Sequence, residues 1–281
     1  MGVAPQSSAH ERSAGPNAGR LIGAESMSFT LVLGPYPQTV RSDSNMETTL
    51  RLLLTSSGVT NDSIRDALVD LLGKRIGDCS ALCIPTAMYG HPWVGPGVNA
   101  WEFISGQSEN PMVELGWKSV GVLELTALPS IGEDRWVPKV RDADVLLVSG
   151  GDAVYLCHWM RQSGLADLLP SLNETVWVGM SAGSMVMTPR IGDDFVGWQP
   201  PDGGDDRTLG IVDFSIFPHL DDAALPSNTM ADAERWAAVI GGKAYAIDNE
   251  TAIRVTDGTV EVVSDGHWRY FPDPAETGPT A

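Results

Sequence analysis

The residues best suited to chemistry in this sequence are a serine and the glycines around it, in Gly179-Met180-Ser181-Ala182-Gly183. A β-branched and aromatic run precedes this G-x-S-x-G pattern and helix-forming residues follow it, which is the context of a nucleophile elbow. Glycine permits the tight bend and the close approach of helix to strand. We therefore expect Ser181 to be a nucleophile at the positive end of a helix, with the Ala182 amide free to bind an oxyanion. The alternative is an incidental serine in a strand–turn–helix.

A serine nucleophile needs a base, because its hydroxyl is weakly nucleophilic at neutral pH. The chain has five histidines: His10, His91, His158, His219 and His267. His219 follows the strongly apolar run 209–217, and sites of α/β proteins gather at the carboxyl ends of strands. We expect His219 to be the base, the alternative being a structural histidine. His91 follows another strand and stays open as a pocket residue.

Two further positions would complete the site. Asp193 and Asp194 follow the expected elbow helix, and a carboxylate there would orient the imidazole. Asp194 is slightly preferred, and the alternative is a solvated acidic loop. Gly150-Gly151 follows another apolar strand, so the Gly151 amide would join that of Ala182 in an oxyanion hole. A glycine pair alone could also be a phosphate loop, but neither dinucleotide-binding nor Walker spacing is present.

The elements that position these residues are strands alternating with helices. Five apolar runs are expected as strands: 50–55, 81–85, 119–125, 145–148 and 175–178. Helical patterns separate them, so the sequence predicts an α/β fold, a doubly wound and mostly parallel sheet covered on both faces. From 244 to 271, apolar and polar residues alternate around Asp257-Gly258 and Asp265-Gly266, which predicts C-terminal antiparallel hairpins.

Composition limits the possible partners. The 281 residues carry a formal net charge of −18, which disfavours nucleic acid and anionic membrane surfaces. No apolar run approaches the ~20 residues of a membrane span. The three cysteines fit reduced thiols of a cytoplasmic protein, and we expect neither a metal nor another cofactor. We expect a leader over 1–45, one domain over 46–272 and a tail over 273–281.

Three motifs together resemble the S51 serine peptidases, a family that includes aspartyl dipeptidase (peptidase E) and cyanophycinase. They are Gly150-Gly151-Asp152, the G-x-S-x-G pattern, and Leu-Gly-Ile-Val-Asp-Phe-Ser-Ile-Phe-Pro-His-Leu-Asp over 209–221. The resemblance covers roughly 50–271. It implies a class I glutamine-amidotransferase-like fold with serine in place of cysteine. By resemblance Ser181 is the nucleophile, His219 the base, and Gly151 and Ala182 the oxyanion donors.

The same resemblance implies a substrate. It favours short peptides, above all dipeptides with an N-terminal aspartate, cleaved through an acyl-enzyme. Arg235 would hold the aspartate side chain, unless it is a surface arginine paired with Glu234 or Asp232 on its own helix. Asp152 stands where peptidase E has asparagine and could change what the pocket accepts. Cyanophycinase-like or other amide hydrolysis, or a catalytically silent ligand-binding homologue, remain alternatives, and a homodimer is possible.

Overall fold

The computed structural model describes residues 50–91, 97–201 and 203–275. The leader expected over 1–45, with His10 in it, and the last residues of the expected tail lie outside this part of the chain. All helices and strands below belong to the compact unit that spans Asn45–Ala281.

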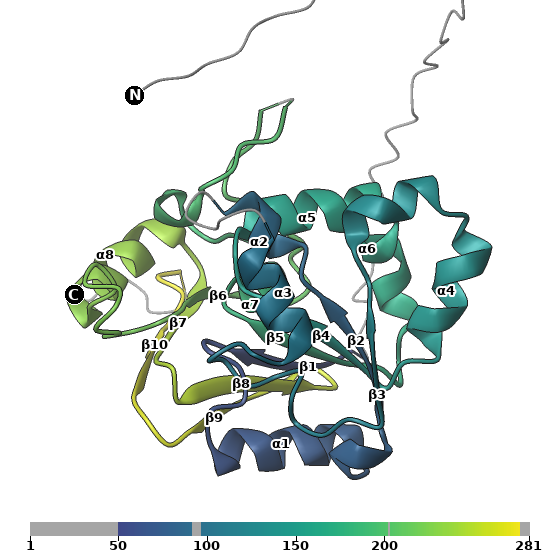
Figure 1. Ribbon diagram of the computed structural model, residues 1–281. Helices are drawn as coiled ribbons and strands as arrows, with labels where there is room; N and C mark the ends of the chain where they lie inside the picture. The colour runs from purple at the N-terminus through teal and green to yellow at the C-terminus, as the bar shows by residue number, and fades with distance from the viewer. Residues whose placement is uncertain (1–49, 92–96, 202, 276–281) are drawn as a thin grey trace, which may run out of the picture. The chain divides into compact units, whose positions relative to one another are not determined.

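The central element is a seven-stranded sheet in the order β3-β2-β4-β5-β1-β8-β9 (Figure 1). The first five strands in this order are parallel, and β8 and β9 are antiparallel. Their bounds are β1 (Arg51–Thr55), β2 (Ser80–Ile84), β3 (Ser119–Val122), β4 (Val145–Val148), β5 (Val176–Met180), β8 (Thr251–Thr256) and β9 (Thr259–Ser264). The expected doubly wound, mostly parallel sheet is confirmed.

Helices cover both faces of this sheet because its strands are apolar on both sides. Leu52 and Leu54 of β1 pack into one core with α2, α4, α5, α6 and α7, whereas Leu53 packs into another with α1 and α3. Figure 1 shows α1 on one side of the sheet and α4, α5 and α6 on the other. The bounds are α1 (Asp62–Leu72), α2 (Ala87–Gly90), α3 (Val98–Ser105), α4 (Glu133–Arg141), α5 (Ala153–Gln162), α6 (Leu165–Leu168) and α7 (Ala182–Met185).

Short 3-10 helices complete the connections, and α1 shows how the sequence sets its ends. They are η1 (Ile76–Asp78), η2 (Leu125–Ser130), η3 (Leu169–Ser171) and η4 (Asp193–Phe195). Asn61 caps α1 by accepting a hydrogen bond from the Ile64 amide, as residues of this type do at helix starts. Gly73 ends the helix with a φ of 65°, in the left-handed region that glycine tolerates.

A second, three-stranded sheet has the order β10-β7-β6. It is formed by β6 (Phe214–Phe217), the parallel β7 (Lys243–Ile247) and the antiparallel β10 (Trp268–Phe271). The amphipathic α8 (Met230–Ile240) packs on β6 and β7, where Trp236 and Phe217 share a third core. The chain therefore leaves β5 to build a small second layer before it returns through β8.

The two expected C-terminal turns behave differently. Asp257 and Gly258 have φ values of 50° and 74° and close the β8–β9 hairpin, as two-residue turns of this composition do. Asp265-Gly266 does not close a hairpin, because β10 leaves the large sheet and pairs with β7 instead. The expected strand over 209–217 is also shorter, since only Phe214–Phe217 is extended. The amides of Leu209 and Ile211 instead donate to carbonyls that follow the elbow helix, at 3.1 and 2.8 Å.

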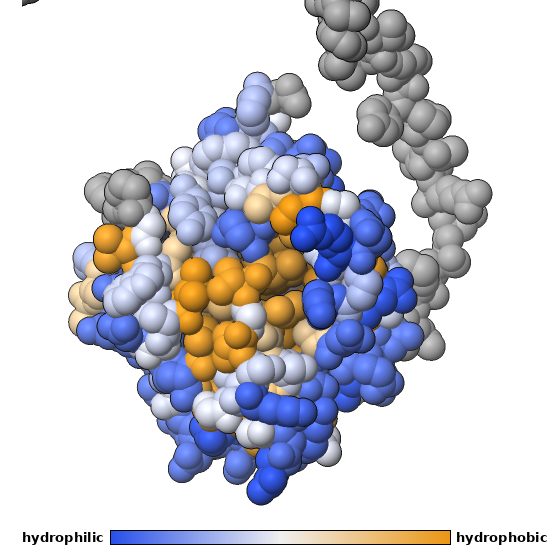
Figure 2. Space-filling view, turned by 45° about the vertical axis from the view of Figure 1, so that its right-hand side comes forward, coloured by the Kyte–Doolittle hydropathy of each residue, from blue (hydrophilic) through white to orange (hydrophobic). Residues whose placement is uncertain are grey.

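The surface of this unit is partly apolar. Val120 and Val122 of the edge strand β3 are 41% and 50% exposed. Figure 2 shows apolar residues gathered in the middle of one face, inside a hydrophilic surround. Across the residues placed by the structure, no helix combines the length and the apolar character needed to cross a membrane.

Candidate active site

The carboxyl ends of several strands meet around a cavity of about 700 Å³. Ser181 follows β5, Gly150 and Gly151 follow β4, and His219 follows β6; all four line the cavity. Parallel strands bring their carboxyl ends to one edge of a sheet, which is where α/β proteins bind ligands. The structure thus brings together the serine, the histidine and the glycine pair that the sequence singled out.

Ser181 occupies a strained turn between β5 and α7. Its φ and ψ are 49° and −110°, a region that side-chain-bearing residues rarely adopt. A Cβ on Gly179 would lie 2.3 Å from the Gly183 carbonyl oxygen, and one on Gly183 would lie 2.5 Å from that of Val148. The Ser181 amide donates to the Thr55 carbonyl at 3.0 Å, which ties the turn to β1. Both glycines are therefore required, as an elbow demands.

The helix that follows Ser181 is short. α7 has only four residues, so its dipole can contribute little at the serine. The close amides offer a more local stabilisation of negative charge. Neither the Ala182 nor the Gly151 amide donates to any acceptor among the residues that the structure places. These are the two amides expected to form the oxyanion hole, and both remain available to a ligand.

The Gly150-Gly151 turn lies directly against the elbow. A Cβ built on Gly150 would lie 3.4 Å from the Cβ of Ser181. Gly151 has a φ of 132°, and a Cβ there would collide with the backbone of Ala87 at 2.3 Å. Position 151 therefore requires glycine, whereas a Cβ at position 150 would only make an ordinary van der Waals contact with Ser181.

The His219 imidazole is held by an amide, and that amide is held by a carboxylate. His219 Nδ1 lies 2.8 Å from Asn249 Oδ1, and Asn249 Nδ2 donates to Asp222 Oδ2 at 2.7 Å. Because Asp222 orients the amide, Asn249 presents an oxygen that can only accept, and Nδ1 must carry the proton. Nε2 is then left with its lone pair, the state a general base requires.

The backbone and surroundings of His219 reinforce this state. Its φ is 55°, and its amide donates to Ser56 Oγ at 2.6 Å, beside the end of β1. Burial lowers the pKa of His219 below its usual 6.5, although the Asn249 hydrogen bond and the Asp222 charge oppose that shift. The imidazole is therefore neutral at pH 7 and able to accept a proton.

Asp193 and Asp194 do not contact the imidazole, contrary to their expected role. Asp194 lines the cavity with Ser181, whereas Asp193 lines only a neighbouring one. Asn249, and not an aspartate, is the hydrogen-bond partner of His219 Nδ1. Because β6 and β7 are parallel neighbours, the residues that follow each strand lie side by side. The polar turn after β7 is the signal that could have revealed Asn249, had β7 been assigned to a parallel pair.

Asp152 is built into the scaffold. Its side chain accepts from the Tyr155 amide at 2.7 Å and from the Trp198 amide at 2.6 Å, so it caps α5 and holds the loop that follows η4. The residue is only 3% exposed, and burial raises the pKa of its carboxyl. It lines the cavity, but both of its oxygens already have backbone partners.

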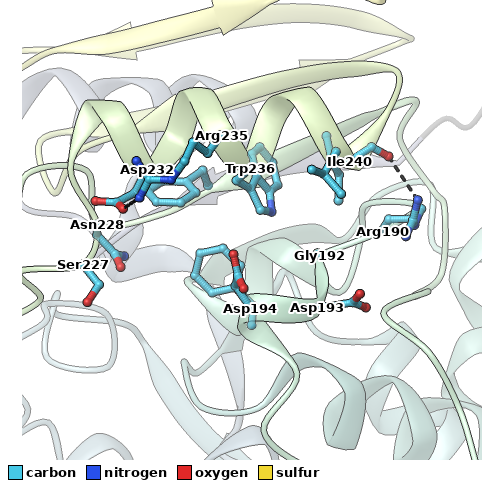
Figure 3. A pocket seen from close by; sticks show the side chains of 13 residues that line it. Arg190, Gly192, Asp193, Asp194, Ser227, Asn228, Asp232, Arg235, Trp236 and Ile240 are labelled. Atoms are coloured by element: carbon cyan, nitrogen blue, oxygen red, sulfur yellow. Dashed lines mark hydrogen bonds and ion pairs between the residues drawn. The ribbon is translucent and has the colours of Figure 1, made fainter.

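Arg235 lies outside the cavity that contains Ser181. It lines an adjoining cavity of about 510 Å³ beneath α8 (Figure 3). Its guanidinium pairs with Asp232 and donates to the Ala231 carbonyl, and its side chain is 70% exposed. These contacts are those of a surface arginine paired along its own helix.

The other placed histidines have distinct surroundings. His91 lines the Ser181 cavity, and burial lowers its pKa. His158 packs edge-on against Trp159, and exposed His267 pairs with Asp221 and Asp248. Within residues 50–91, 97–201 and 203–275, no group of three or more His, Cys, Asp or Glu side chains is arranged to hold a metal ion.

Comparison with known proteins agrees with this geometry. The model of peptidase family S51 matches residues 52–263, three quarters of the chain. The chain belongs to this family. It is therefore a serine peptidase.

Solved structures share the S51 fold with this chain. A candidate peptidase E from Listeria monocytogenes EGD-e is 19% identical, with a TM-score of 0.55 over 77% of this chain and 99% of that one. A peptidase from an acI-B1 Actinobacterium is also 19% identical, with a TM-score of 0.56 over 80% and 95%. No curated protein sequence matches this chain. At this identity the likeness concerns the fold alone.

Proposed function

We propose that this S51 peptidase hydrolyses short peptides through an acyl-enzyme formed on Ser181, with His219 as the general base. The observation that carries the proposal is the chain of contacts from Asp222 through Asn249 to His219, beside a strained serine in one cavity. A cavity of about 700 Å³ has the size of a small-molecule site, which supports short substrates.

The reaction follows from these positions. Ser181 Oγ attacks the scissile carbonyl while His219 Nε2 takes its proton, and the carbonyl oxygen gains the negative charge. The Gly151 and Ala182 amides stabilise that charge. The imidazolium then returns the proton to the leaving amine as the C–N bond breaks. In the second half of the reaction, water attacks the acyl-enzyme ester while His219 takes its proton. The acid is released as His219 returns that proton to Ser181 Oγ.

Asn249 and Asp222 act at a distance from the substrate in this mechanism. Asn249 keeps the imidazole in one tautomer, and Asp222 keeps the amide of Asn249 in one orientation. The Asp222 charge also favours the imidazolium that forms during each proton transfer. All three side chains of this relay are partly buried, which strengthens their electrostatic interactions relative to those in water.

The narrower expectation of an N-terminal aspartate finds no support in the cavity. A substrate carboxylate would need a cation, and the described lining includes neither lysine nor arginine. Arg235 already has carboxylate and carbonyl partners in the neighbouring cavity. The proposed function therefore requires no aspartate in the substrate.

A cytoplasmic location is part of the proposal because all three cysteines are buried free thiols. Disulfides are rare in the reducing cytosol, so unpaired cysteines suit that compartment. Burial also raises the pKa of Cys83 to about 11, which keeps that thiol protonated and unreactive.

The direct test is hydrolysis of a panel of dipeptides and isoaspartyl peptides by the parent protein and by Ser181→Ala. We expect the parent to release amino acids and the variant to lose about 10⁶-fold in kcat, as occurs when such a nucleophile is removed. Circular dichroism should show both proteins folded. Equal turnover by the two proteins would contradict the proposal, and an inert parent would favour a silent ligand-binding homologue.

A further inference from the structure

The acidic and basic side chains that line the cavity around Ser181 give it a negative charge. No lysine or arginine is found among its described lining residues, and its carboxylates are Asp152 and Asp194. Asp152 is buried, with both oxygens bonded to backbone amides. Asp194 is exposed and forms no hydrogen bond or ion pair with the residues that the structure places. Asp194 therefore offers a carboxylate that a ligand can use.

The turn that carries Asp194 is firmly seated. Gly192 precedes it with a φ of 88°, and a Cβ there would lie 2.4 Å from Trp236 Nε1. The Gly192 amide donates to Asp206 Oδ2 at 2.9 Å. On the other side, the Phe195 ring packs edge-on against Phe217, with 5.3 Å between ring centroids. The carboxylate thus projects from a fixed support rather than from a loose loop.

Asp194 stands on the wall between the two cavities. It lines both of them, together with Phe195, Ser227 and Asn228. Figure 3 shows its carboxylate rising from η4 into the space that faces α8, while the Asp193 carboxylate points in a different direction. Asp193 lines only the cavity beneath α8. The two neighbouring aspartates therefore form a natural test pair.

The nearby arginines do not neutralise Asp194. Arg190 Nε lies 3.0 Å from both oxygens of Asp206, whose side chain is 2% exposed. Arg235 is paired with Asp232. The wider chain adds a net charge of −18, which attracts cations and repels anions as they approach.

We infer that the substrate carries a positively charged group near its scissile bond, on the N-terminus or on the first side chain, and that Asp194 receives this group. The inference rests on the proposed function and narrows its substrate class. A peptide with a free N-terminus holds its ammonium one carbon away from its first carbonyl. A lysine or arginine side chain offers the same kind of partner from further away. An acidic residue at the cleaved position would meet repulsion.

The experiment compares substrate pairs that differ in this charge alone. The parent, Asp194→Asn and Asp193→Asn are assayed with Ala-Leu and with N-acetyl-Ala-Leu. We expect the free amine to raise kcat/KM of the parent about tenfold. Asp194→Asn should lose this advantage, mainly through KM, because the contact is present before the transition state. Asp193→Asn should keep it. Added salt should weaken the advantage in the parent.

A second substrate pair identifies the source of the amine. N-acetyl-Lys-Leu is compared with N-acetyl-Ala-Leu. Faster cleavage of the lysine peptide, dependent on Asp194, would show that a side-chain ammonium is received. Dependence limited to the unblocked Ala-Leu would show that the N-terminal ammonium is received. Either result supports the inference.

Other results overturn the inference. Equal discrimination by Asp194→Asn and the parent would do so, as would a preference of the parent for Asp-Leu over Ala-Leu. Labelling of Ser181 by a fluorophosphonate separates this failure from that of the proposed function. Loss of labelling in Asp194→Asn alone would give Asp194 a catalytic role and reject the inferred one. Absence of labelling in the parent would reject the proposed function and, with it, the inference.

Discussion

The two cavities that meet at Asp194 differ in how their charges are used. The cavity beneath α8 has more charged side chains, but Arg190 pairs with Asp206, and Arg235 with Asp232. The cavity around Ser181 has fewer charges, yet it contains a strained serine and a neutral imidazole held by a hydrogen-bonded relay.

The paired charges beneath α8 serve the fold, whereas the groups around Ser181 are arranged for reaction. The Arg190–Asp206 pair helps to hold the turn before η4, and the exposed Arg235–Asp232 pair lies within α8, so neither arginine is left without a partner for a ligand to use. A catalytic group must keep one atom that can react with the substrate. An imidazole that is hydrogen-bonded at Nδ1 and still has its lone pair at Nε2 is such a group. The number of charged residues around a hollow is therefore a poor guide to its activity.

Of the substitutions that distinguish the two cavities, His219→Ala is expected to lower kcat the most. Removing the base should lower kcat nearly as much as removing Ser181, about 10⁶-fold, because the two act as one unit. The matched control is His91→Ala, which removes another histidine from the same cavity and should have a mild effect. Steady-state hydrolysis of the best dipeptide measures both. A dead His91→Ala beside an active His219→Ala would assign the base to His91.

The next effect is expected from Asn249→Ala. Without the amide, Nδ1 loses its acceptor and the imidazole can adopt the wrong tautomer. By analogy with other orienting residues, kcat should fall about 10³-fold. Circular dichroism and thermal unfolding should show a folded protein. Unchanged kcat would mean that the contact between Asn249 and His219 does not serve catalysis, and that another residue orients the base.

A smaller effect is expected on the pH profile of Asp222→Asn. The base acts in its neutral form, so kcat/KM rises as pH increases through the pKa of His219. The Asp222 charge raises that pKa against the lowering effect of burial. Removing the charge should therefore move the acid limb to lower pH, as measured from kcat/KM between about pH 4 and 8. A shift to higher pH would contradict this electrostatic role.

The smallest effect is expected from Arg235→Ala, in the cavity beneath α8. Because the guanidinium is exposed and paired on its own helix, kcat/KM should change by less than about twofold for neutral and acidic dipeptides alike. The same panel of substrates measures it. A selective loss of Asp-Leu cleavage would restore Arg235 as the aspartate-binding residue and break the distinction between the two cavities.

Much of the fold could be predicted because its signals are local. Apolar runs bounded by turns gave the five parallel strands, and Gly179 and Gly183 marked a place where a helix approaches a strand closely. The strand expected over 209–217 was too long because apolar residues also pack well as a loop against the elbow helix. Sequence periodicity cannot separate these two uses of apolar side chains.

The site could be predicted only where one segment contains its own chemistry. Ser181 and Gly151 can be predicted from the glycines next to them in the sequence. Asn249 does not, since it approaches His219 only because β6 and β7 pair in parallel, and nothing within either segment specifies that pairing. Asp193 and Asp194 were predicted to orient His219 because they follow the elbow helix closely in sequence. In the structure neither of them contacts the imidazole.

The most direct test of the central claim is fluorophosphonate labelling of the full chain, followed by mass mapping of the modified peptide. The reagent reacts with a serine only when a base and an oxyanion hole activate it. We predict a single adduct on Ser181, which disappears in Ser181→Ala, is strongly reduced in His219→Ala and persists in His91→Ala. An unlabelled parent protein, or an adduct on any other serine, would contradict it.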